Sequence, residues 1–448
     1  MTSSRRNLAG LLLLAAFLCG SVSSAHALPA FARKYGLRCS ACHEAWPMLN
    51  YFGQKFKDNG YQLMNDRDAP IWQNPSYWPV TFRITPFWHR ESTDKVQVDT
   101  AGGGSAEQQV TNHGFDLSGL DFHTGGTLEK NLSFYVLPSS DATGAFHFET
   151  VMARLDNLFG SSWFNIKLGK FELDNLVSEK RILTLTNISG VYETYHFIPV
   201  GDNNIFGQIG DNQLGVEWMG HSSNDRSRVS AALLSSNDGQ VGLPSSNAYS
   251  GFFAASQAFD VGKLGVDRIG GYAMVGEAPT YFLTTAGGPV ATPFGNAGGQ
   301  GNKSFSREGF VGMFYFGKVD FLVVTQHGSD NAYFGTSTAS NVALPTGARN
   351  PTWNGYMVES HYVYSPQLVF IQRSEWERMS QQALPTNPSN LGNMDMYTFG
   401  YRWYPIMTSR AGFAFHNEYS WLRTNGISPL TAGDVTSSSL LLGFDFDF

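Results

Sequence analysis

The C-terminal end of the chain alternates between apolar side chains and side chains that are mostly small or acidic. The apolar set occupies every second position: Leu440, Leu442, Phe444, Phe446 and Phe448. Between them stand Leu441, Gly443, Asp445 and Asp447. Because successive side chains of a β-strand point to opposite faces, this two-residue period predicts a strand with one apolar face and one largely polar face.

The same period recurs over most of the chain, starting near residue 80. It is clearest at 80–89, 132–136, 164–168, 214–218, 397–404 and 413–421. Turns are expected at 125–131 and 405–409, and the tracts rich in Gly, Ser, Thr, Ala and Asn at 101–104, 289–301 and 335–350 are expected to be loops. Short turns that alternate with long loops are typical of outer-membrane barrels.

Strands that are aromatic on one face and polar on the other fit a barrel with lipid outside and polar groups inside. Charged residues make up only 15% of the chain and aromatic residues 14%. Lipid tolerates no open strand edge, so the sheet must close. We therefore predict an all-β transmembrane barrel of about 16 antiparallel strands, porin-like, with 14 or 18 strands as alternatives. A secreted soluble β-sandwich or β-propeller would explain neither the outward aromatic side chains nor the terminal Phe448.

The N-terminus has the pattern of a secretory signal peptide. Arg5 and Arg6 precede an apolar run of about 12 residues, which is too short to span a bilayer, and Ala25-His26-Ala27 is a cleavage signal. We expect residues 1–27 to be removed. The loss of two arginines makes a chain of net charge −7 more acidic still, which disfavours nucleic acid as a partner.

Cys39-Ser40-Ala41-Cys42-His43 is the covalent attachment motif of c-type haem. The two thiols add to the haem vinyl groups, and the adjacent His43 is the proximal iron ligand. Thioredoxin-type redox chemistry would require a βαβ setting, and a zinc site would require further ligands. We predict one covalently attached haem c, bound by Cys39, Cys42 and His43, and no conventional catalytic residues.

An amphipathic helix is predicted after the motif, from Pro47 to Asn59, with Leu49, Phe52 and Phe56 packed on the haem. Residues 28–78 are near the lower size limit for independent folding, so we expect an α-helical haem plug whose core is completed by the haem and by the wall of a barrel over residues 79–448. The sixth iron ligand stays open. Met64 is the nearest donor, His89 on the first strand is another, and Met48 lies too close to His43.

The chain resembles the fused outer-membrane cytochrome-porins of iron-oxidising bacteria, in which one c-type haem precedes a porin-like barrel. The likeness is specific in the haem segment and mostly architectural in the barrel. The matching residues are Phe31-Ala32-Arg33, the haem motif, Pro47, Leu49, Phe52-Gly53, Phe56-Lys57 and Gly60-Tyr61, with weaker likeness at 128–134 and 168–171 and the terminal Phe448.

The resemblance implies an electron conduit in the bacterial outer membrane, with the haem segment in the barrel lumen or at its periplasmic side. An extracellular donor, Fe(II) in the family, would reduce the haem, and a soluble periplasmic cytochrome would accept the electron. Any enzymatic activity would be outer-sphere iron oxidation rather than hydrolysis or group transfer. The alternatives are a solute porin with a haem plug or redox sensor, for which Lys167, Arg402 and Glu418 would line the lumen, and electron export to an external acceptor. His113, Asp116, Asp121 and His123 are scattered along a predicted strand, and their spacing does not mark an iron site.

Overall fold

The computed structural model of this chain describes most of its length. The described residues are 30–45, 48–63, 79–140, 144–173, 212–235, 248–262, 266–279, 282–285, 288–291, 302–330, 352–379, 393–408, 411–425 and 434–447. The signal-peptide and long-loop predictions at 1–27 and 335–350, together with Pro47, Met64 and Phe448, fall outside these ranges.

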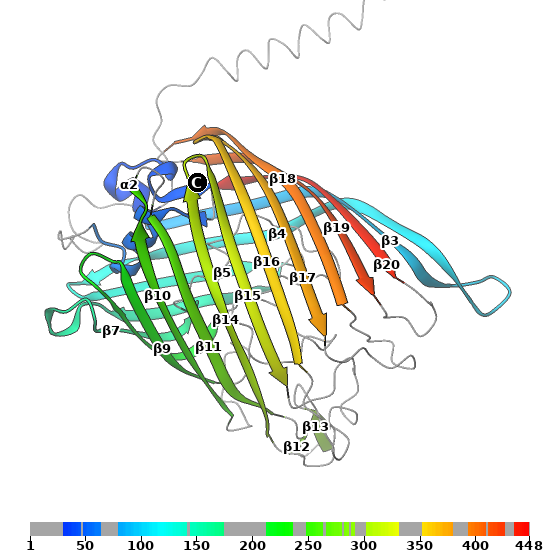
Figure 1. Ribbon diagram of the computed structural model, residues 1–448, viewed down its shortest axis with the longest axis horizontal. Helices are drawn as coiled ribbons and strands as arrows, with labels where there is room; N and C mark the ends of the chain where they lie inside the picture. Colours follow the sequence, from blue (N-terminus) through cyan, green and yellow to red (C-terminus); the bar gives the residue numbers. More distant parts are fainter. Residues whose placement is uncertain are drawn as a thin grey trace, which may run out of the picture.

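A closed barrel of 16 strands forms the body of the molecule (Figure 1). Neighbours pair antiparallel, and β20 pairs with β3 to complete the ring. The strands are β3 (Val80–Asp99), β4 (Ser105–Glu129), β5 (Leu132–Ser140), β6 (Phe146–Leu155), β7 (Asn165–Phe171), β8 (Gln213–His221), β9 (Ser227–Ser235), β10 (Tyr249–Asp260), β11 (Val266–Pro279), β14 (Asn302–Phe316), β15 (Val319–Asp330), β16 (Thr352–Ser365), β17 (Leu368–Met379), β18 (Asn393–Met407), β19 (Gly412–Asn425) and β20 (Val435–Asp447). The predicted porin-like antiparallel barrel and its strand number are confirmed, whereas the predicted c-type cytochrome plug stays a prediction.

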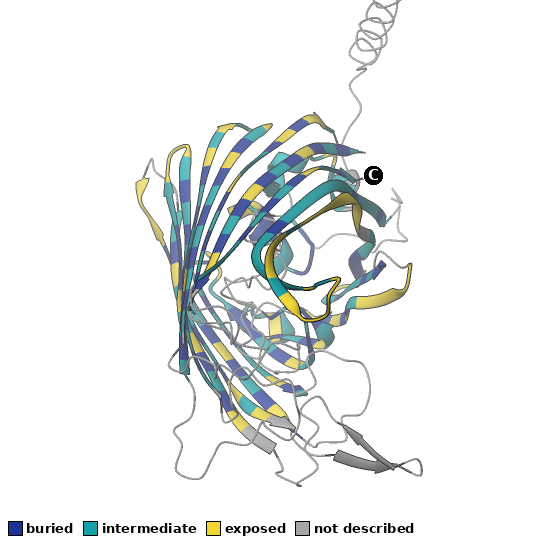
Figure 2. Cartoon of the chain, turned by 90° about the vertical axis from the view of Figure 1, so that its right-hand side faces the viewer, coloured by how far each residue is buried: buried dark blue, intermediate teal, exposed yellow. Residues whose placement is uncertain are grey.

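Burial alternates along the strands as the sequence period predicts (Figure 2). Outward side chains such as Phe310, Phe399 and Tyr419 are exposed, whereas the inward side chains Lys167, Arg402 and Glu418 are buried. Inward Asp445 accepts hydrogen bonds from Arg83 at 3.0 Å and Arg402 at 3.4 Å. The barrel thus has an apolar outer face and an ion-paired inner face, as a transmembrane barrel requires.

The connections between strands are mostly short at one end of the barrel and mostly long at the other. The antiparallel order puts the joins at 130–131, 156–164, 222–226, 261–265, 317–318, 366–367 and 408–411 at one end, together with the start of β3 and the end of β20. The joins at 100–104, 141–145, 172–212, 236–248, 280–301, 331–351, 380–392 and 426–434 lie at the other end, and six of these eight are nine residues or longer. The predicted alternation of short turns with longer connections is confirmed.

Two turn predictions and one loop prediction are wrong. β4 continues through Gly125 and Gly126, so its turn with β5 is confined to 130–131, and β18 runs to Met407 instead of ending before Pro405. A Cβ at Gly125 would lie 2.7 Å from Cδ2 of Tyr135, so this glycine permits close packing on a strand rather than a turn. Part of the expected loop at 289–301 is a strand, β13 (Gly288–Ala291), which pairs with β12 (Phe282–Thr285).

The N-terminal segment forms a small plug at the short-turn end of the barrel (Figure 1). Its elements are α2 (Ala30–Tyr35), α3 (Cys39–Cys42), β1 (His43–Ala45), β2 (Met48–Leu49) and α4 (Tyr51–Asp58). α4 begins later than the predicted Pro47 because Asn50 is its N-cap, with Oδ1 accepting from the amide of Gly53 at 2.9 Å. Within the described part of the chain, no helix combines the length and hydropathy needed to cross a bilayer.

Candidate functional site

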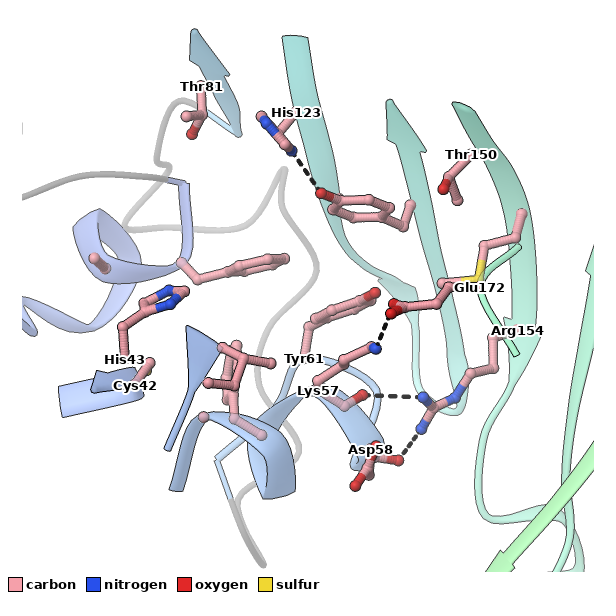
Figure 3. Close-up of a pocket in the computed structure, with 18 of the residues that line it drawn as sticks. Cys42, His43, Lys57, Asp58, Tyr61, Thr81, His123, Thr150, Arg154 and Glu172 are labelled. Atoms are coloured by element: carbon pink, nitrogen blue, oxygen red, sulfur yellow. Dashed lines mark hydrogen bonds and ion pairs between the residues drawn. The ribbon is translucent and has the colours of Figure 1, made fainter. Parts of the chain in front are cut away.

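A mostly apolar cavity lies between the plug and the inner wall of the barrel (Figure 3). The cavity has a volume of about 190 Å³. Cys39, Cys42 and His43 all line this cavity from the plug. The other lining side chains include Phe31, Arg38, Leu49, Phe56 and Tyr61 of the plug and Thr81, His123, Tyr135, Met152, Arg154, Lys167, Met219 and Asp447 of the wall.

Asn50 ties the haem motif to helix α4. Its Nδ2 donates to the carbonyl of Ala41 at 3.1 Å, and its backbone amide donates to the carbonyl of Cys42 at 2.9 Å. Gly53 sits against the same turn, because a Cβ there would lie only 2.0 Å from the oxygen of Cys42. The sequence prediction missed Asn50, although a cap residue just before the Phe52/Phe56 pattern was a usable signal.

Cys39 and Cys42 do not form a disulfide. Burial raises the pKa of the Cys42 thiol to about 11. Reactive Cys-x-x-Cys thiols have a lowered pKa, because the thiolate is the attacking species. Cys42 therefore lacks the lowered pKa that marks an attacking thiol.

One side of the plug is bound to β6–β9 through buried charges (Figure 3). Arg154 on β6 donates to the carbonyls of Lys57 and Asp58 at the end of α4 and pairs with Asp156. Lys57 Nζ pairs with Glu172 at 2.8 Å, and Asp58 pairs with Arg228. Cations that meet the C-terminal carbonyls of a helix also complement its dipole.

The opposite side of the plug meets β15 and β16. Glu44, the residue after His43, hydrogen bonds with Asp320, and burial raises the pKa of its carboxyl to about 8. Asp320 in turn pairs with Nδ1 of His361 at 2.5 Å. β15 and β6 lie on opposite sides of the ring, so the plug reaches from one wall of the barrel to the other.

Stacked rings connect the plug to His123 on the wall. Phe31 stacks on Tyr61 at a centroid distance of 4.8 Å, and Tyr61 stacks on Tyr135 of β5 at 5.8 Å. The hydroxyl of Tyr135 hydrogen bonds with Nδ1 of His123 at 2.6 Å. His123 is thus an ordered wall residue of the cavity that holds the haem motif.

Several sequence predictions can be placed against this geometry. Leu49 and Phe56 line the cavity, whereas Phe52 is 41% exposed and is not among the cavity residues; the packing of all three on a haem stays a prediction. His89 bonds with Ser439 at 2.7 Å, and neither His89 nor Met48 is among the cavity residues. Asp121 pairs with Arg83, and within the described ranges no group of three His, Cys, Asp or Glu forms a metal centre of its own.

No protein-family model matches the chain, and a search of curated proteins finds no similar sequence. Solved structures that it is similar to include an anion-selective porin from Comamonas acidovorans, at 11% identity and TM-score 0.48, covering 82% of this chain and 99% of that one. The outer membrane channel DcaP of Acinetobacter baumannii is similar at 10% identity and TM-score 0.47, covering 84% and 100%. A loop-deletion mutant of OmpT from Vibrio cholerae is similar at 11% identity and TM-score 0.48, covering 83% and 100%. At these identities and scores the likeness carries no functional argument.

Proposed function

We propose that this protein is an outer-membrane electron conduit. It takes electrons from an extracellular donor, Fe(II) being the donor we favour, and passes them through one covalently bound haem c to a soluble periplasmic cytochrome. The observation that carries the proposal is the single cavity in which the two thiols and His43 meet, closed by the barrel wall. Cys39 and Cys42 would hold the haem through thioether bonds, and His43 would be its proximal ligand.

The residues present fit such a group. Neither cysteine is in a disulfide, and aromatic side chains of plug and wall line the cavity. Arg38 brings positive charge to the cavity, which suits a haem carboxylate, whereas Lys57, Arg154 and Lys167 there are paired with Glu172, Asp156 and Glu217. A haem bound here would supply one-electron chemistry, with a potential set by its axial ligands, its burial and the nearby charges.

The lengths of the connections at the two ends of the barrel indicate which side of the membrane the cavity would face. In outer-membrane barrels the short turns face the periplasm and the longer loops face the outside. The plug and its cavity lie at the short-turn end. The cavity would therefore lie close to a periplasmic acceptor, and an extracellular donor would have to approach it from the long-loop end, through the interior of the barrel.

A solute porin with a haem plug or redox sensor is the second candidate. A closed ring of 16 strands is wide enough for an aqueous channel. Two observations weigh against it: the plug reaches both walls, and the inward charges Lys167, Arg402 and Glu418 are at most 5% exposed. Electron export to an external acceptor would use the same site and differ in potential.

Stopped-flow mixing of the purified, haem-loaded protein with Fe(II) tests the proposal. We expect the haem to be reduced by Fe(II) and then reoxidised by a soluble c-type cytochrome. The matched control is the double variant Cys39→Ser/Cys42→Ser, which should lose covalent haem but keep the heat-modifiable migration of a folded barrel. A wild-type protein without covalent haem, or a haem that Fe(II) does not reduce, would overturn the proposal.

A further inference from the structure

The barrel wall brings donors to the cavity that sequence reasoning did not place there. His123 on β4, Met152 on β6 and Met219 on β8 all line it, and each carries an atom that binds haem iron. We propose that His123 is the second axial ligand, opposite His43. This inference rests on the proposed function, because it requires a haem at Cys39 and Cys42.

Position in the ring favours His123 over the two methionines. Sγ of Cys39 lies 3.7 Å from the carbonyl of Thr408, so the turn between β18 and β19 contacts the motif. Along the sheet order, β4 is three strands from β19, whereas β6 is five and β8 is seven. His123 is in register with Thr81 of β3, and Thr81 also lines the cavity.

The surroundings of His123 resemble those of a metal-ligating imidazole. Ligating histidines engage their second ring nitrogen with a fixed partner, which sets the tautomer and the ring orientation. Tyr135 provides that partner, at 2.6 Å from Nδ1 (Figure 3). In the tautomer in which Nδ1 donates to the tyrosine oxygen, Nε2 carries the lone pair that binds iron.

Tyr135 is itself fixed by the plug. Its ring stacks on Tyr61. A side chain at position 125 would not fit, because its Cβ would lie 2.7 Å from Cδ2 of Tyr135 and 3.4 Å from Cζ of Phe31. The hydrogen bond to His123 therefore depends on plug and wall being packed together. Met152 by contrast belongs to an apolar cluster with Phe56 and Tyr61, which gives it a packing role. Two imidazoles would give a lower reduction potential than a His/Met pair.

The test is the ferric spectrum of the haem-loaded full chain in wild-type and variant forms. For wild type we expect a low-spin haem without the near-infrared band of iron–thioether coordination. His123→Ala should become high-spin, and added imidazole should restore the low-spin spectrum. His123→Met should gain the thioether band and a raised potential. The matched controls, Met152→Leu, Met219→Leu and His89→Ala, should keep the wild-type spectrum.

The outcomes separate this inference from the function on which it rests. A thioether band in wild type, lost in Met152→Leu or Met219→Leu, would assign the ligand to that methionine and overturn the inference, as would an unchanged spectrum in His123→Ala. If His123→Ala does not retain haem, the inference is tested by two other results: the absence of the thioether band in wild type and its appearance in His123→Met. Absence of covalent haem from wild type would instead refute the proposed function itself.

Discussion

Removal of the Arg154 guanidinium should release the plug from the wall without unfolding the barrel. Arg154 is 3% exposed and contacts the carbonyls of Lys57 and Asp58 as well as the carboxylate of Asp156. In Arg154→Leu the fully buried Asp156 would keep a hydrogen bond from Ser133 at 2.6 Å but lose its counter-charge.

The structure sets the scale of this effect. Breaking a buried ion pair by removing one partner costs about 3–5 kcal/mol. No discount for solvent screening applies, because both side chains are buried. If the cost falls on plug docking, the opening equilibrium of α4 should rise about 10²- to 4 × 10³-fold, at about 1.4 kcal/mol for each factor of ten.

Amide hydrogen exchange of the full chain in detergent measures this opening directly. We expect α4 to exchange about 100-fold faster or more in Arg154→Leu, while β14 to β20 keep their protection. The matched control is Arg226→Leu, which removes a 47% exposed arginine that pairs with Asp260 at 3.5 Å and should change nothing measurable. Unchanged protection of α4, or an equal loss in the distant strands, would refute the role given to Arg154.

Three further variants test other parts of the structure. Asn50→Ala should lower covalent haem incorporation, because it removes both the cap of α4 and the donor to the Ala41 carbonyl, at a cost of about 1–3 kcal/mol. Asn50→Asp keeps the cap, so its haem incorporation should lie between those of wild type and Asn50→Ala. Haem stain per folded barrel measures the incorporation, and equal stain in wild type and both variants would contradict this role of Asn50. Gly125→Val should displace Tyr135 and speed exchange in α4, whereas Gly114→Val, with no atom within 4 Å of the new Cβ, should not; equal exchange in both would count against the packing argument. Asp445→Ala should lower the temperature at which the barrel unfolds on gels, since it leaves Arg83 and Arg402 without their shared carboxylate at a cost of about 3–5 kcal/mol. Asp434→Ala is the control, because Asp434 pairs with Arg423 and its side chain is 38% exposed. Equal unfolding temperatures of the two variants would be evidence against a stabilising inner-wall network.

The barrel was predictable from the sequence because its signal is repeated and local. Each strand carries its own two-residue period, and lipid outside requires the sheet to close, so β20 and β18 could be recognised without knowledge of their partners. Strand ends were less predictable. Gly125 and Pro405 have the composition of turns, but both lie in strands, and tertiary packing against Tyr135 explains the first.

The cavity was only half predictable. The haem motif is contiguous, so Cys39, Cys42 and His43 could be named from spacing alone. The wall residues that complete the cavity come from strands far apart in the sequence, and they meet the motif only because the plug lies inside the ring. His123 was recognised merely as one of four scattered His and Asp residues, because nothing local distinguishes it before Tyr135 and the plug are in place.

Electron transfer across a sealed membrane tests the central claim most directly. The full chain, loaded with haem, would be placed in lipid vesicles that contain a soluble c-type cytochrome, and Fe(II) would be added outside. We predict reduction of the enclosed cytochrome by wild type, without entry of a labelled sugar, and no reduction in vesicles that carry Cys39→Ser/Cys42→Ser. Equal reduction with wild type and variant, or sugar entry without reduction, would contradict the account and favour a solute porin.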